Sequence, residues 1–335
     1  MKVLITGSTG FLGKYLLDEF SKDTKDQVIA FGRNVEKGHE LEKDNISFYQ
    51  GDFTNLKEIT DAVRDVDLVI HAGALSTVWG DWAAFYQANV KGTQYVVEAC
   101  ITQGVKRLVF VSSPSIYTGK IDQEQITEKF SIPNQHLNHY IKSKIMAEAV
   151  VNDMTKNKAL EAVIIRPRGL FGIGDTSILP RIINANQKVG VPLIRNGSNL
   201  VDITYVENVA LAIYLAATVA GIDGETFNIT NGEPKIFKDI LNQMFEKLAM
   251  TVRFRRINFH IATGLAVSLE GFYRLFRLKG EPILTKYLVY TLGTTQTLDI
   301  SKAQKVLGYK PRYTIEEGMS IYAEWWRENH TDKKE

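Results

Sequence analysis

The sequence has one cysteine, almost no net charge and no long uncharged apolar run, and each scarcity excludes a class of protein. Cys100 is the only cysteine in 335 residues, so no internal disulfide can form. Forty basic and 38 acidic residues leave a net charge of +2, and no basic stripe is interleaved with aromatics, so nucleic acid is not an expected partner. No charged leader with a cleavable apolar segment precedes the first apolar run, which favours a cytoplasmic location.

The chain is rich in short apolar segments. Hydrophobic residues make up 44% of it, enough to fill a sizeable core. Short apolar runs lie at residues 2–6, 27–34, 46–52, 67–74 and 106–113, and helix-type patterns separate them. This alternation predicts an α/β fold with a Rossmann-type doubly wound parallel sheet that is covered on both faces.

Three glycines follow the first apolar run at spacing i, i+3, i+6. Gly7 can take a strained turn, Gly10 lets a ligand approach the backbone, and Gly13 lets the following helix pack on the strand. The N–H groups at the start of that helix can then face a diphosphate. The pattern predicts a dinucleotide site, with an ordinary strand-helix turn as the alternative.

The second expected strand ends in Gly32-Arg33, where dinucleotide folds usually carry an acid for the adenosine ribose. Arginine suits a 2′-phosphate because its planar fork binds a dianion that a carboxylate would repel. We therefore expect NADP(H) in preference to NAD(H); a solvated loop arginine is the alternative. Asp52 is placed to contact the adenine, and the small residues Ala72, Gly73 and Ala74 let the backbone run close to the cofactor.

Tyr140 and Lys144 lie one turn apart on the same face of an expected helix. A nearby ammonium favours the phenolate and brings the pKa of the tyrosine toward neutrality. Ser113 ends the fifth expected strand, at the edge where ligands of open α/β sheets bind, so it can hydrogen-bond the substrate oxygen that Tyr140 protonates. In isolation, a tyrosine and lysine at this spacing would more often be a surface pair.

Together with the Arg166-Pro167 strand end, these motifs resemble the extended short-chain dehydrogenase/reductases in order and spacing. The resemblance implies that Tyr140 is the acid/base, that Lys144 binds the nicotinamide ribose, and that Ser113 orients a carbonyl. It implies that Asn89 supports the site by holding a water or a helix irregularity, and that helices near 95–100 and 143–150 form a homodimer. The predicted cofactor contacts are Gly7, Thr9, Gly10, Phe11, Leu12, Arg33, Asp52, Phe53, Ala72, Gly73, Ala74, Tyr140, Lys144, Pro167 and Gly169.

The resemblance divides the chain into two parts. Residues 1–166 are expected to form the NADP-binding domain, and segments at about 200–230 are expected to return to it. Residues 167–330 are expected to form mainly the substrate-binding region, and the polar residues 331–335 a tail.

Two positions separate this sequence from the family's sugar-nucleotide enzymes. Gly169 stands where those enzymes usually carry an asparagine, and Val201 where they carry an arginine that clamps a diphosphate. Arg168 and Arg195 offer compensating charges, so a nucleotide-sugar epimerase or dehydratase stays open as an alternative. An NADP-sensing binding protein is the non-enzyme alternative.

The segment 257–292 is long and apolar, and Glu270, Arg274 and Arg277 interrupt it too often for a transmembrane helix. We expect an amphipathic helix in 257–278 that packs on the substrate region, lines a pocket for a lipid-like substrate, or rests on a membrane surface.

This segment and the tryptophan-bearing loop 74–82 resemble the 3β-hydroxysteroid dehydrogenase-like and 2-alkyl-3-oxoalkanoate reductase branch. The resemblance implies interconversion of a ketone and a secondary alcohol, a 3-oxo or 3-hydroxy group on an apolar, steroid-like or acyl-chain substrate. We predict no metal site, and substrate contacts at Trp79, Ser115, Phe171, Val201 and Tyr205.

Overall fold

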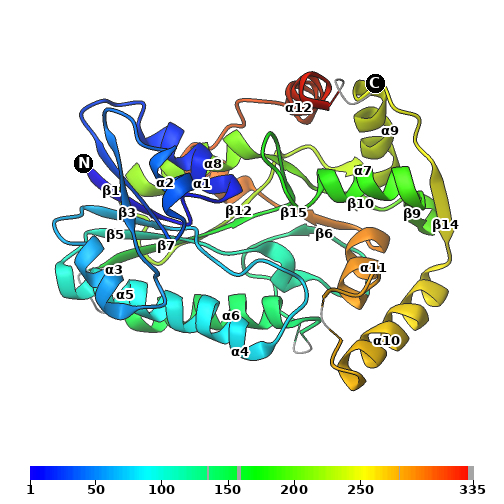
Figure 1. The fold of residues 1–335 in the computed structure, drawn as a ribbon, viewed down its shortest axis with the longest axis horizontal. Helices are drawn as coiled ribbons and strands as arrows, with labels where there is room; N and C mark the ends of the chain where they lie inside the picture. Colours follow the sequence, from blue (N-terminus) through cyan, green and yellow to red (C-terminus); the bar gives the residue numbers. More distant parts are fainter. Residues whose placement is uncertain (134–135, 157–159, 279, 331–335) are drawn as a thin grey trace.

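The computed structural model describes residues 1–133, 136–156, 160–278 and 280–330, and the predicted tail 331–335 lies outside this range. A seven-stranded sheet, in which every neighbouring pair is parallel, forms its centre (Figure 1). From edge to edge the strands are β12 (Thr226–Ile229), β7 (Glu161–Pro167), β5 (Arg107–Val111), β4 (Leu68–His71), β1 (Lys2–Thr6), β2 (Gln27–Gly32) and β3 (Ile46–Gln50). The predicted doubly wound sheet is confirmed.

Helices cover both faces of this sheet. On one face α1 (Phe11–Phe20) packs beside α8 (Val206–Thr218), while α3 (Leu56–Ala62), α5 (Gly92–Gln103) and α6 (His139–Thr155) cover the other (Figure 1). The shorter helix α2 (Val35–His39) contacts β3, and the shorter helix α4 (Trp82–Phe85) contacts α6. Each face buries its own hydrophobic core, which explains why the strands are continuous apolar runs.

The later part of the chain builds a second lobe around its own core. Its helices are α7 (Leu179–Lys188), α9 (Phe237–Lys247), α10 (Phe259–Leu275), α11 (Lys286–Gly293) and α12 (Ile315–His330). Its strands are β6 (Gln123–Ile126), β8 (Leu170–Phe171), β9 (Val191–Ile194), β10 (Leu200–Val201), β11 (Thr204–Tyr205), β13 (Lys235–Ile236), β14 (Phe254–Ile257) and β15 (Gln296–Leu298). They form small sheets in the orders β13-β10-β15-β6, β11-β8 and β14-β9.

The chain crosses between the lobes more than once. The strand β12 completes one edge of the large sheet, and α8 covers its face. A later segment also joins the first lobe: the short π-helical turn η4 (Ala303–Leu307) and Tyr309 belong to the same core as α1 and α8. The first lobe is therefore completed by residues from the end of the chain as well as from the middle.

Helix α10 has an unusual distribution of side chains. The helix lies at the rim of the molecule (Figure 1), and its buried positions are Ala262, Ala266 and Glu270. Most of its large apolar side chains are exposed. Those exposed in and just after the helix are Ile261, Leu265, Val267, Phe272, Leu275, Phe276 and Leu278. Among the described residues no helix has the length and apolar character needed to span a bilayer.

Candidate active site

The predicted glycine turn connects β1 to α1. Gly7 has φ +73°, and a Cβ there would lie 2.8 Å from the Gly73 backbone at the end of β4. A Cβ on Gly13 would lie 2.2 Å from the Gly7 carbonyl oxygen, so both positions require glycine. Within the described chain no side chain caps α1 and no acid lies in its first turn, so the helix N-terminus is available to an anion. These features fit a dinucleotide diphosphate.

Most of the other predicted cofactor residues gather at the same edge of the sheet. Thr9, Phe11 and Leu12 lie at the turn and the start of α1, and the segment 72–74 follows β4 directly. The ring of Phe53 packs against His71, 5.2 Å between centroids, just below that segment. Pro167 is the buried last residue of β7, and Gly169 follows with φ +53°.

Arg33 extends from the end of β2 into solvent, and its side chain is 78% exposed. Its Nη1 lies 3.6 Å from Oδ2 of Asp52, whose other oxygen accepts hydrogen bonds from Thr54. An exposed ion pair of this length contributes little stability, so the guanidinium is available to another anion.

The predicted catalytic side chains meet where β5 ends and α6 begins. Ser113 follows β5 and lies close enough to the Tyr140 hydroxyl to lower its pKa, and Ser113 Oγ donates to Ser115 Oγ at 2.9 Å. Burial of the Tyr140 hydroxyl raises its pKa to about 12, and Ser113 partly opposes the rise, so the expected shift toward neutrality is wrong for the protein without cofactor, because burial outweighs the other effects. One turn along α6, the Lys144 ammonium is buried and donates to the Val111 carbonyl at 2.7 Å. Burial lowers the pKa of Lys144 to about 7.

Asn89 lies behind this group, in the π-helical turn η1 (Tyr86–Lys91) before α5. Its amide donates to Ser143 Oγ at 2.8 Å and to the Leu75 carbonyl at 3.0 Å, and its oxygen accepts from the Leu75 N–H at 2.7 Å. Asn89 thus connects α6 to the loop after β4. It lies in a helix irregularity, and its contacts are those of a residue that positions other groups. Its predicted role in the site stays a prediction.

A buried ionic network joins α6 to β7. Arg166 at the end of β7 donates through Nε and Nη2 to both carboxylate oxygens of Glu148, at 2.9 and 2.5 Å, and through Nη1 to the Tyr117 hydroxyl. Tyr117 in turn donates to Oδ1 of Asn228 on β12 at 3.2 Å. Glu148 lies one turn beyond Lys144 and raises the pKa of that lysine against the effect of burial.

The predicted substrate residues fall into two groups. Trp79 in the loop after β4 lies edge-to-face against Tyr273, with 6.3 Å between centroids, and under the guanidinium of Arg274, so this loop meets α10. Ser115 is buried beside Ser113. The others, Phe171, Val201 and Tyr205, lie in the core of the second lobe. Their predicted contact with substrate stays a prediction.

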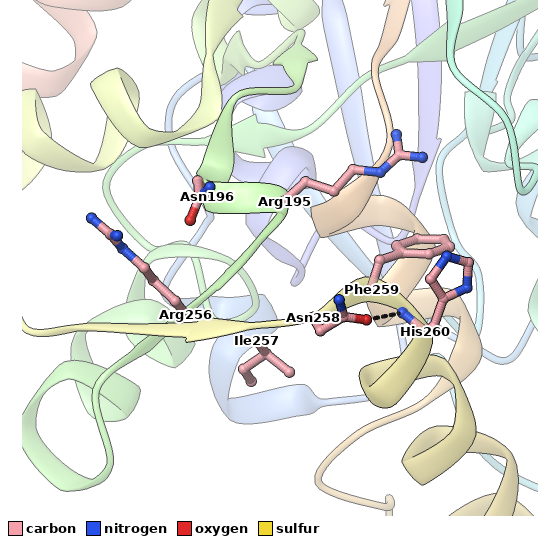
Figure 2. A pocket seen from close by; sticks show the side chains of 7 residues that line it. All are labelled: Arg195, Asn196, Arg256, Ile257, Asn258, Phe259 and His260. Carbon is pink, nitrogen blue, oxygen red and sulfur yellow. Dashed lines mark hydrogen bonds between the residues drawn. The ribbon is translucent and has the colours of Figure 1, made fainter.

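A surface cavity of about 390 Å³ lies in the second lobe, apart from these catalytic residues. Figure 2 shows its lining, with Arg195 and Arg256 extending away from each other and Asn258 accepting a hydrogen bond from the His260 N–H. The guanidinium of Arg195 is already bound to both oxygens of Asp122, each at 2.9 Å. The cavity has no group in common with the Tyr140 site.

Sequence reasoning missed three groups in the region of Tyr140, Lys144 and Arg168. Glu148 continues the spacing of Tyr140 and Lys144 along α6 and could have been found from it. Asp202 and Tyr287 had no local signal, because only the folded chain brings their segments to the end of β7. Both groups raise the pKa of Arg168 against the effect of burial, and Tyr287 also raises the pKa of Tyr140.

Comparison with known proteins agrees with this geometry. Residues 4–259 match the 3-beta hydroxysteroid dehydrogenase/isomerase family. A 2-alkyl-3-oxoalkanoate reductase of Stenotrophomonas maltophilia (strain K279a) is 34% identical over 95% of this chain and 97% of its own length. A sterol-4-alpha-carboxylate 3-dehydrogenase, decarboxylating, of Candida albicans (strain SC5314 / ATCC MYA-2876) is 30% identical over 98% of both chains.

Solved structures share the fold at lower identity. A UDP-glucuronic acid 4-epimerase from Bacillus cereus, in complex with NAD, has a TM-score of 0.79 and 20% identity over 98% of this chain and 100% of its own. The predicted resemblance is therefore confirmed. The chain belongs to the 3-beta hydroxysteroid dehydrogenase/isomerase family among the extended short-chain dehydrogenase/reductases, and it is a nicotinamide-dependent oxidoreductase.

Proposed function

We propose that this protein interconverts a ketone and a secondary alcohol, a 3-oxo or 3-hydroxy group on an apolar acyl-chain or steroid-like substrate, through Ser113, Tyr140 and Lys144. The observation that carries the proposal is that the Tyr140 hydroxyl lies beside Ser113 and one helical turn from the buried Lys144 ammonium. Relatives named as a 3-oxoalkanoate reductase and a sterol 3-dehydrogenase support the position of the reacting oxygen.

Each side chain has a distinct task in the reduction. With a pKa of about 12, Tyr140 holds its proton at neutral pH and donates it to the substrate oxygen. Ser113 can turn its hydroxyl from Ser115 to the same oxygen and hold the carbonyl in place. Protonated Lys144 lowers the cost of the phenolate that remains. The nicotinamide dinucleotide, when bound, supplies or accepts the hydride at the carbonyl carbon.

The test is turnover of a panel of hydroxy lipids, steroids and oxoacyl compounds with each nicotinamide cofactor. Tyr140→Phe removes the transferable proton, and we expect a loss of about 100- to 10,000-fold in kcat. Tyr49→Phe, an exposed tyrosine on β3, is the matched control. Unchanged turnover in Tyr140→Phe would refute the mechanism.

We propose NADP(H) as the preferred cofactor, because exposed Arg33 is bound only weakly to Asp52. Solved structures of similar fold carry NAD, which is the alternative. In Arg33→Ala the KM for NADPH should rise about tenfold or more while the KM for NADH changes little. Arg64→Ala, an exposed arginine paired with Asp61, is the control. A wild-type enzyme that prefers NADH would contradict this assignment.

The nucleotide-sugar alternative has weaker support at the two positions that separate the groups. Val201 is packed into the core of the second lobe and offers no charge to a diphosphate. Gly169 takes a left-handed backbone in which a Cβ would lie 3.1 Å from the Asp202 carbonyl oxygen, so its lack of a side chain is a steric requirement here. A melting screen against UDP- and GDP-sugars tests this alternative, since a bound ligand raises the melting temperature.

A further inference from the structure

His71 is a buried histidine in the large sheet that the proposed mechanism does not use. It is the last residue of β4, is 1% exposed, and pairs in the sheet with Thr6, the last residue of β1. Both ring nitrogens have a partner: Nδ1 lies 2.7 Å from Thr6 Oγ1, and Nε2 lies 3.1 Å from Thr93 Oγ1 on α5. Both threonines are also buried, so the ring is held at its two ends.

The hydroxyls of the two threonines determine which ring nitrogen carries the proton. The Thr93 hydroxyl donates its only proton to the Asn89 carbonyl at 2.6 Å, so its oxygen accepts from Nε2–H of His71. Nδ1 then accepts from the Thr6 hydroxyl, whose oxygen in turn accepts the Gly73 N–H at 3.1 Å. Burial lowers the pKa of His71 to about 3. The ring is therefore neutral, with its proton fixed on Nε2.

One end of this chain of hydrogen bonds lies at the expected cofactor site. Thr6 directly precedes Gly7, and a Cβ on Gly7 would lie 2.8 Å from the Gly73 backbone. The Gly73 N–H bond to Thr6 therefore holds the glycine turn against the segment after β4. Both segments are expected to contact the dinucleotide, so this end of the chain bears on cofactor binding.

The other end lies at the helix that carries Tyr140. Thr93 holds the Asn89 carbonyl, and the Asn89 amide donates to Ser143 Oγ on α6 at 2.8 Å. Ser143 Oγ donates to the Tyr140 carbonyl, also at 2.8 Å. The imidazole is thus connected to the backbone of Tyr140 through printed contacts of three side chains, and this end bears on the position of the reacting hydroxyl.

A packing contact reaches the same helix. The His71 ring packs on Phe110 of β5 with 5.6 Å between centroids, and Lys144 Nζ lies 4.2 Å from the centroid of that phenyl ring. A shift of the imidazole would therefore disturb the site at both Tyr140 and Lys144.

We propose that His71 is a positioning residue whose Nδ1 bond to Thr6 and Nε2–H bond to Thr93 set the glycine turn and α6 at the separation that hydride transfer needs. The proposal rests on the proposed function, because Tyr140 must be the group on α6 that serves the reacting carbon. The two bonds have separate tasks. The bond to Thr6 supports cofactor affinity, and the bond to Thr93 supports kcat.

Two substitutions of His71 separate these tasks. His71→Gln places an amide N–H near the position of Nε2 and keeps the donor to Thr93, whereas His71→Asn places an amide oxygen near Nδ1 and keeps the acceptor for Thr6. With the best compound of the substrate panel, kcat should fall about 10- to 100-fold in His71→Asn and much less in His71→Gln. The cofactor dissociation constant, from fluorescence titration, should rise more in His71→Gln. Equal losses of both quantities in the two variants are those of a core residue and would overturn the proposal.

The hydroxyl of Thr93 provides a second test with a matched control. Thr93→Val removes the acceptor of Nε2–H and should lower kcat about 10- to 100-fold while cofactor affinity changes little. Thr93→Ser restores the hydroxyl and should restore kcat. Thr102→Val is the control, because Thr102 on the same helix donates to the carbonyl of Glu98, four residues earlier, at 2.8 Å and is exposed. A Thr93→Ser variant as slow as Thr93→Val would contradict the proposal.

Measurements without substrate separate this proposal from the proposed function. If the wild type turns over no compound of the panel, the proposed function fails, and hydrogen exchange still tests the connection. Cofactor binding should slow exchange in the first turns of α6 in the wild type and Thr93→Ser, but not in Thr93→Val saturated with cofactor. Equal protection in all three would refute the connection. Nitrogen NMR of the full-length protein should show His71 neutral with its proton on Nε2, and a ring that titrates between about pH 5 and 8, or carries its proton on Nδ1, would also refute it.

Discussion

The buried pair of Glu148 and Arg166 allows a quantitative test of how the site is supported. Both side chains are almost completely buried, at 7% and 8% exposure, and the pair joins α6, which carries Tyr140 and Lys144, to the end of β7. We consider Glu148→Leu, Arg166→Met and the double variant. Each single substitution leaves one charge buried without its partner, whereas the double substitution leaves none.

The burial of both charges sets the expected losses of unfolding free energy. Removal of one partner of a buried pair costs about 3–5 kcal/mol of unfolding free energy. The double variant replaces both charges by apolar groups of similar volume, and only the Tyr117 hydroxyl then loses a donor, which costs about 1–3 kcal/mol. The double variant should therefore be more stable than either single one. The unfolding free energies lost in the two single variants should together exceed the loss in the double variant by several kcal/mol.

The two single variants should also differ in their effect on Lys144. Glu148 raises the pKa of that lysine, so Glu148→Leu should lower it further below about 7 and shift the loss of reductase activity to lower pH. Arg166→Met leaves the Glu148 carboxylate with Lys144 as a nearby cation, so this variant should raise the pKa of Lys144. The loss of reductase activity should then move to higher pH. The pH profile of kcat/KM in each variant measures this difference.

Urea denaturation followed by circular dichroism measures the stabilities. Lys43→Ala is the matched control, because Lys43 pairs with Asp18 at 2.7 Å with both side chains about 60% exposed, and such a pair contributes about 0–1 kcal/mol. Losses in the two single variants that simply add in the double variant would refute the reasoning. So would pH profiles that shift in the same direction.

Three further predictions follow from single features. Since burial lowers the pKa of Lys144 to about 7, kcat/KM for ketone reduction by the wild type should fall as pH rises through that value and the ammonium is lost; a profile flat to pH 9 would contradict this. Gly13→Ala places a Cβ 2.2 Å from a carbonyl oxygen and should abolish cofactor binding, measured by fluorescence titration. Its control is Gly264→Ala in α10, whose Cβ meets nothing within 4 Å and should add up to about 1 kcal/mol of stability. The exposed apolar residues of α10 beside Arg274 and Arg277 should bind anionic phospholipid vesicles in a sedimentation assay; Leu275→Asp should weaken binding and Ile121→Asp should not, and a wild type that stays in the supernatant would disprove membrane contact.

The parts of the site that the sequence predicted are those set by local spacing. Gly7, Gly10 and Gly13 lie at the junction of β1 and α1, and Tyr140 and Lys144 lie one helical turn apart in α6. Their geometry therefore depends only on the elements that contain them. The strands at 27–34, 46–52, 67–74 and 106–113 were also found, each a few residues longer than observed. The inner strands among them form continuous apolar runs because both of their faces are buried. The predicted homodimer depends on a second chain and stays a prediction.

The parts that the sequence could not predict depend on how segments distant in the sequence pack against one another. Phe171 and Tyr205 were predicted as substrate contacts, and that contact stays a prediction. The structure places them under α12, where a Cβ on Gly318 would lie 2.6 Å from the Tyr205 ring. No local pattern near residue 205 indicates that the end of the chain covers it. The neighbourhood of Arg168 and Tyr287 has the same origin.

The same reasoning connects the exposed helix to the site. A helix that served only to fill a core would turn its large apolar side chains inward, but α10 buries Ala262 and Ala266 and so lies close against α11. Between them, Glu270 accepts the Lys286 N–H at 2.7 Å, at the residue before Tyr287. On its other side α10 holds Trp79 of the loop after β4 through Tyr273. The helix therefore contacts two segments, the loop after β4 and the start of α11. A surface that binds the outer face of α10 would act on both segments at once.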